Sequence, residues 1–223
     1  MFVFKSNINS FHYLYQDAEY FHGVAHDPNA GFTAVRASRS AVLLYILSLE
    51  ALINRALDHF APQELREFFL AREERFSIED KWQLLPLLAG KLGERHFDRS
   101  RYPWSHFAEL IKLRNDFVHP KHDRAAYYEA LTKSKWLPLA WNRIPDGMDI
   151  KESEIVYRLT RIPRDPYAIR EEHADTVKSV VDAMIVELDR LLEGRILRDD
   201  WCRRDQMGLA WPVGAKLDDL PSE

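Results

Sequence analysis

The segment IKLRNDFVHP, residues 111–120, places three side chains close together that can act on a phosphate group: Arg114, Asn115 and His119. Histidine titrates near neutral pH, so it can accept or donate a proton. Arginine is a permanently charged, planar donor that matches phosphate oxygens, and the asparagine can orient either group. Together they provide what phosphoryl transfer on RNA needs without a metal: a base, an acid and stabilisation of charge at phosphorus.

Apolar residues around this motif recur at the spacing of one buried helix face. That face is predicted to carry Phe107, Leu110, Ile111, Arg114 and Val118. Arg114 thus stands where an apolar residue is expected, and burying a guanidinium without a partner is costly. We expect it to face a polar pocket, an anion or a second chain. His119 lies about 140° around the helix from Arg114. The two side-chain ends can therefore reach one point only if the long arginine side chain spans the gap or if a second copy of the chain supplies one of them.

Each of these residues also has a structural interpretation. Arg114 can form an ion pair with a buried carboxylate such as Glu50. His119 suits the end of a helix, where the helix dipole favours a cation, and the neighbouring asparagine can be a surface amide. Spacing alone carries little weight, because a second Arg-x4-His pair exists at Arg101 and His106. A proline interrupts that second segment.

Composition restricts how the chain can contact nucleic acid. It has 223 residues, which suits one domain, and a net charge of -4, so it is not a polycation. Between residues 91 and 124 there are eight Lys or Arg against five Asp or Glu, which predicts a local basic surface beside the motif; a solvated face of mixed charge is the alternative. To RNA binding or support we assign Lys112, Asp116, Lys121, His122 and Glu50.

Metal, cofactor and export signals are not recognisable in the sequence. The single cysteine, Cys202, excludes an intrachain disulfide and a cysteine-rich zinc site. His119 and His122 form an H-x-x-H pair, but Pro120 breaks the helix that would align them. We therefore expect no metal and no cofactor. The opening residues resemble neither a signal peptide nor a membrane span, so we expect a cytoplasmic protein with no membrane contact.

Helical periodicity dominates the chain. Helices are predicted over residues 9–24, 32–60, 61–74, 77–93, 103–119, 123–134 and 169–194. Asn9 or Ser10 is the predicted N-cap of the first helix, and Ser77, with Asp80 three residues on, that of another. We expect a small hairpin or irregular insertion at about 136–167, and a C-terminal tail at about 195–223. Trp136 and Trp141 belong to that insertion, and they serve either base stacking or packing.

The motif LRNDFVH resembles the Arg-polar-x3-His motif of HEPN domains (higher eukaryotes and prokaryotes nucleotide-binding). The segment SLEALINRAL, residues 48–57, is similar to the early core helix of that family with its glutamate, and the helix over 169–193 to its closing helix. The resemblance covers about 32–132 and 168–194. It implies a helical bundle that dimerises.

In active HEPN members, the Arg and His of both chains line one cleft and cut RNA without metal, leaving a cyclic phosphate and a 5′-hydroxyl. The resemblance therefore implies that Arg114 and His119 are catalytic and Asn115 supporting. We expect a single all-α, HEPN-like domain over residues 1–223. It is expected to be a homodimeric endoribonuclease that acts on RNA. The expected setting is a toxin–antitoxin or phage-defence system, with an antitoxin or other protein partner. The alternatives are a non-catalytic module that binds a nucleotide or a protein, and a plain helical interaction protein.

Overall fold

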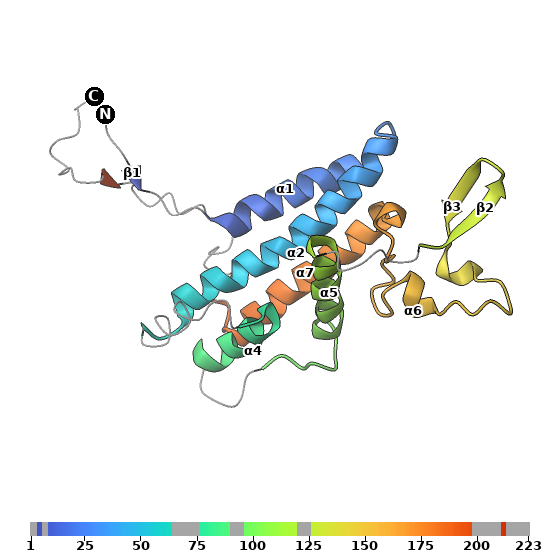
Figure 1. Cartoon of the computed structure of the whole chain (residues 1–223). Coiled ribbons are helices and arrows are strands. Elements are labelled where there is room, and N and C mark those ends of the chain that lie inside the picture. The colour runs from blue at the N-terminus through green and yellow to red at the C-terminus, as the bar shows by residue number, and fades with distance from the viewer. Residues whose placement is uncertain are drawn as a thin grey trace, which may run out of the picture.

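The fold is a bundle of helices with a small hairpin at one end (Figure 1). The computed structural model describes residues 4–5, 9–63, 76–89, 96–119, 126–197 and 211–212. Its helices are α1 (Ser10–Ala25), α2 (Phe32–Phe60), α4 (Ile78–Ala89), α5 (Trp104–Val118), α6 (Glu152–Ile155) and α7 (Glu171–Leu191). Its antiparallel strand pairs are β2 (Tyr128–Thr132) with β3 (Lys135–Pro138), and β1 (Phe4–Lys5) with β4 (Trp211–Pro212). The all-α class with a small hairpin is confirmed.

Helix α2 is the centre of the bundle, in contact with α1, α4, α5 and α7. Its predicted apolar stripe is buried: Val42, Ile46, Leu49, Ile53 and Leu57. In Figure 1, α1 and α7 run alongside α2 while α5 lies across α2 and α7. Within the described part of the chain, α2 is also the one helix long and apolar enough to cross a membrane, judged by length and composition; buried core helices of soluble proteins pass the same test.

The helix ends follow the capping rules used to predict them. The Asn9 side chain accepts a hydrogen bond from the His12 N–H at 3.3 Å. Ser77 and Asp80 form the expected reciprocal pair, each side chain accepting from the other's N–H at 3.1 Å. After α7, Gly194 has φ 79° and donates to the Asp189 carbonyl at 2.8 Å. Glycine adopts this left-handed conformation without steric cost, and it ends the helix.

The helix predicted over 123–134 is wrong for the residues that the structure describes. From Tyr128 to Thr132 the chain forms β2, which pairs with β3 directly after the turn at 133–134. Both strands are mostly exposed, so no buried face was available to stabilise a helix there, and tyrosine, threonine and tryptophan favour the strand. The hairpin therefore begins ahead of residue 136. The helix predicted over 61–74 lies outside the described residues except for 61–63.

The buried stripe of α7 provides a direct test of the packing. Met184 is 0% exposed and Val186, on the same helix, is 57% exposed. We expect Met184→Ala to lower the free energy of unfolding by about 2–5 kcal/mol, because the cost of losing buried apolar surface and the cost of leaving a cavity add together. Val186→Ala should change it by less than about 0.5 kcal/mol. Urea denaturation followed by circular dichroism measures both, and equal losses would contradict the orientation of α7.

Candidate functional site

The motif lies at the end of α5 where the helix leaves the core. Phe107, Leu110 and Ile111 are buried, as the periodicity predicts, and burial ends at Leu113. The prediction that Val118 is buried is wrong, since its side chain is 42% exposed. In the last turn of α5, Phe117 still packs against the core, whereas Asn115, Val118 and His119 are exposed. The exposed side of this turn is therefore accessible to a ligand or a partner.

Arg114 is held in place by two neighbours. Its Nη2 donates to Glu50 Oε2 on α2 at 3.1 Å, and its Nη1 donates to Asn115 Oδ1 at 3.0 Å. The Arg114 and Glu50 side chains are 20% and 29% exposed, so the ion pair is neither dry nor fully solvated. This geometry places Glu50 next to the motif, and it fixes the plane of the guanidinium while leaving one edge of the pair in contact with solvent.

His119 ends α5, as the sequence predicts. Its N–H donates to the Asn115 carbonyl at 2.9 Å, and its backbone (φ −126°, ψ 68°) leaves the helical region. The side chain is exposed. Within the described part of the chain, no hydrogen bond or ion pair joins it to Arg114. Lys112 is exposed on the same helix, whereas Lys121 and His122 lie outside the described residues.

Two acidic residues of α5 attach the insertion to the motif helix. The Glu109 carboxylate accepts hydrogen bonds from the Leu159 N–H at 3.0 Å and the Thr160 N–H at 2.9 Å. Asp116, which we assigned to RNA binding or support, accepts a short hydrogen bond from the Tyr157 hydroxyl. Sequence reasoning missed Glu109. An acidic residue on a helix gives no local signal that distant backbone N–H groups will reach it.

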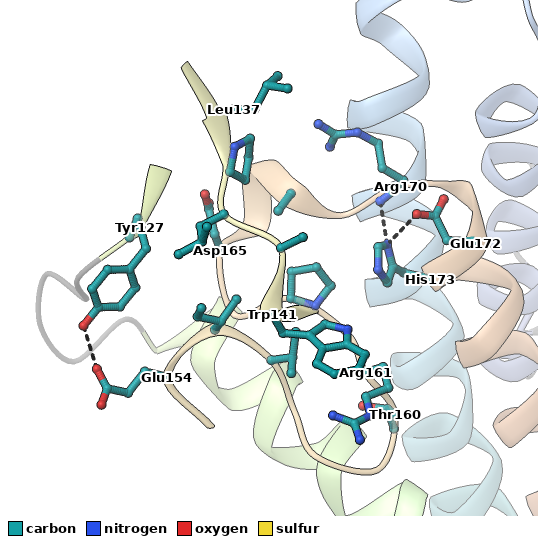
Figure 2. A pocket seen from close by; sticks show the side chains of 18 of the residues that line it. Tyr127, Leu137, Trp141, Glu154, Thr160, Arg161, Asp165, Arg170, Glu172 and His173 are labelled. Atoms are coloured by element: carbon teal, nitrogen blue, oxygen red, sulfur yellow. Dashed lines mark hydrogen bonds and ion pairs between the residues drawn. The ribbon is translucent and has the colours of Figure 1, made fainter. Parts of the chain in front are cut away.

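A cavity of about 510 Å³ lies between the insertion and the first turns of α7 (Figure 2). Its walls include Trp141, over whose ring the Arg161 guanidinium lies at 4.5 Å. On the α7 side, His173 Nδ1 accepts the Arg170 N–H at 3.0 Å. Burial holds the pKa of His173 below its ordinary value, so this imidazole is neutral near pH 7. The lining is of mixed charge, with Arg161 and Arg170 against Glu154, Asp165 and Glu172, beside the Trp141 ring. Such a cavity is suited to a small ligand with an apolar ring and a few polar groups.

Among the described residues, one group of histidine and acidic side chains is close enough to hold a metal ion: His22, His26 and Asp175. Burial alone would raise the pKa of Asp175, but hydrogen bonds from both histidines lower it, so the carboxylate is ionised. The sequence analysis did not identify this cluster. The His-x3-His spacing was a usable signal, whereas Asp175 becomes a neighbour only because α7 packs against α1.

Comparison with other proteins leaves the family open. No family model, no curated protein and no solved structure is significantly similar to this chain. The resemblance to HEPN domains therefore stays a prediction that rests on the motif and its helical surroundings. The geometry of the chain itself has to support any function.

Removing the Arg114 side chain would leave the half-buried Glu50 carboxylate without its charge partner. We expect Arg114→Ala to lower the free energy of unfolding by about 1–3 kcal/mol, a modest loss because solvent still reaches the pair. Glu50→Gln should also lower the free energy of unfolding, and this loss should be smaller by about 0.5–3 kcal/mol in the Arg114→Ala variant than in the wild type. Urea melts of the four proteins form a double-mutant cycle, and additive losses would show that the two side chains do not interact.

Proposed function

We propose that this protein is a metal-independent endoribonuclease of HEPN type that acts as a homodimer. One observation carries the proposal. Glu50 and Asn115 orient the Arg114 guanidinium at the solvent-facing end of α5, in the same turns as the exposed His119. The ion pair with Glu50 is also what the structural interpretation of Arg114 predicts, but with side chains 20% and 29% exposed it leaves the guanidinium fixed in orientation and partly accessible to solvent. Such fixing is typical of catalytic side chains.

The chemistry follows from these two side chains. His119 takes the proton from a 2′-hydroxyl, and the 2′-oxygen attacks the adjacent phosphorus. Arg114 stabilises the negative charge that develops on the phosphate oxygens. The bond from phosphorus to the 5′-oxygen breaks, and a second, protonated imidazole gives that oxygen its proton. The products are a 2′,3′-cyclic phosphate and a 5′-hydroxyl.

A second copy of the chain supplies the second imidazole in this scheme. Arg114 and His119 point about 140° apart on one helix, and Val118 between them is an exposed apolar residue. A two-fold axis near the end of α5 would cover Val118 and bring two copies of the motif around one cleft. The toxin–antitoxin or phage-defence setting, with an antitoxin or other protein partner, is a proposal that rests on the resemblance alone. The cytoplasmic location is a proposal that rests on the opening residues, which resemble neither a signal peptide nor a membrane span.

The cleavage reaction tests the assignment of the base. Purified protein should cut mixed RNA in the presence of EDTA and leave cyclic phosphate ends. His119→Ala should reduce the rate by at least about 10²-fold. It should keep the melting temperature within a few degrees, because an exposed helix-terminal histidine contributes only about 0.3–1 kcal/mol through the helix dipole. Gel electrophoresis of the RNA and a thermal melt measure the two effects.

The matched control is His106→Ala, a substitution on α5 that alters the other Arg-x4-His pair, and this variant should cut RNA at the wild-type rate. Arg114→Lys keeps the charge but loses the planar fork, and should lower the rate by roughly 10²-fold. RNA that stays intact with the wild-type protein would reject the nuclease. The alternative, a module that binds a nucleotide, would then be examined at the cavity of Figure 2, which is lined by the Trp141 ring and by Arg161, a residue that is also ion-paired with Glu152.

The homodimer has its own test at Val118. A charged side chain there is harmless in a monomer because the position is exposed, but it would be buried in the proposed interface. We expect Val118→Asp to turn a dimer into a monomer in analytical ultracentrifugation and to abolish cleavage with it. Val186→Asp, on an exposed position of α7, should leave both unchanged. A wild-type protein that is monomeric at micromolar concentration would contradict the two-fold cleft.

A further inference from the structure

We propose that His22, His26 and Asp175 form a binding site for a divalent first-row transition-metal ion of the zinc class. His22 lies in the last turn of α1 and His26 is its C-cap, so the two imidazoles project from successive turns. Asp175 lies in the first turns of α7. The site is remote from the motif on α5 and plays no part in the proposed nuclease chemistry.

The distances fit a small ion. His22 Nε2 and His26 Nε2 lie 2.7 and 3.0 Å from Asp175 Oδ1, and 3.2 Å from each other. Ligands around a tetrahedral ion with bonds of 2.0–2.1 Å are separated by about 3.3 Å. To coordinate one ion, the three separations of 2.7, 3.0 and 3.2 Å need to open by about 0.6, 0.3 and 0.1 Å. Larger calcium-type spheres, with 6–8 oxygens at 2.3–2.6 Å, do not match.

The triangle can form without a metal, since both Nε2 atoms can carry hydrogen and donate to Asp175 Oδ1. That arrangement leaves the 3.2 Å contact between the two nitrogens without a hydrogen bond. A cation at the centre would instead accept a lone pair from all three atoms at once. The convergence of three possible ligand atoms on one point, all within 4.8 Å of one another, is the observation that carries the metal site.

Tyr45 completes the site as an orienting residue. Its hydroxyl lies 3.1 Å from His22 Nδ1, and its side chain is 0% exposed in the core of α2. When Nδ1–H donates to this oxygen, His22 Nε2 carries no hydrogen and its lone pair is free for a metal. Metal-bound histidines usually have such a partner on the other ring nitrogen. His22, whose side chain is 13% exposed, is thus held against the core while its Nε2 points at Asp175.

The donor set and the exposure indicate the kind of ion. Two imidazoles and one carboxylate are borderline ligands that prefer zinc, iron(II) or cobalt(II) to magnesium or calcium. The His22 side chain is 13% exposed, whereas those of His26 and Asp175 are 47% and 53% exposed. One side of the ion would therefore face solvent and keep a position for water. Bound there, the ion would also join the end of α1 to the start of α7.

The test uses the full-length protein after chelator treatment and dialysis. Zn²⁺ is titrated in competition with a chromophoric chelator, and Co²⁺ binding is followed by its visible absorption. We expect one equivalent of each ion to bind. His26→Ala and Asp175→Asn should each weaken binding by at least about 100-fold, and Tyr45→Phe by about 10–100-fold. The control His12→Ala, on the same helix α1, should bind as the wild type does.

Two results would overturn the site: no saturable binding by the wild type up to about 100 µM Zn²⁺, or wild-type affinity in both His26→Ala and Asp175→Asn. Both substitutions are at largely exposed positions, and circular dichroism verifies that each variant is folded. Saturating Zn²⁺ should raise the melting temperature of the wild type but not of Asp175→Asn, because only a bound ion stabilises the folded chain. RNA cleavage in EDTA is independent of these measurements, so either proposal can fail alone.

Discussion

The need to bury α2 determines the arrangement of the other helices. Over its 29 residues it carries twelve buried positions, too many for a single neighbour to cover. Each fully buried aliphatic side chain contributes about 1.5–3 kcal/mol, so leaving one side of α2 in water would remove a large share of the stability. Helices α1, α4, α5 and α7 therefore pack around it, and their own apolar stripes face inward. The side chains that these helices carry, including those of the candidate site on α5, are positioned by this packing.

The polar residues of the candidate site lie at the margin of that packing. Glu50 stands between buried positions of α2, is 29% exposed and meets Arg114 of α5. At this margin the ion pair keeps part of its hydration, which limits the desolvation penalty. His119 is exposed at the end of α5, next to a turn in which Phe117 still packs against the core. The candidate active site thus lies on the exposed side of the last turns of α5.

The first turns of α7 form a second polar region. His173 and Glu172 face the cavity beneath the insertion, and Asp175 faces the histidines of α1 (Figure 2 shows the cavity side). Along the rest of α7, one face is an apolar stripe that packs against α2. Glu109 connects the two regions, because it binds the insertion to α5 through the backbone of Leu159 and Thr160. Rigid helices therefore position both regions.

Local pattern in the sequence determined the long helices, their caps and the position of the motif, because periodicity and capping depend on residues three to five positions apart. A small hairpin was predicted at about 136–167, but it forms at 128–138, since pairing with β3 outweighed helix propensity over residues 128–132, a segment with no face to bury. The exposure of Val118 depended on where neighbouring helices end. Asp175 lies 149 residues from His26, and only the packing of α7 on α1 made them neighbours, because contacts between helices depend on the shape of the whole core.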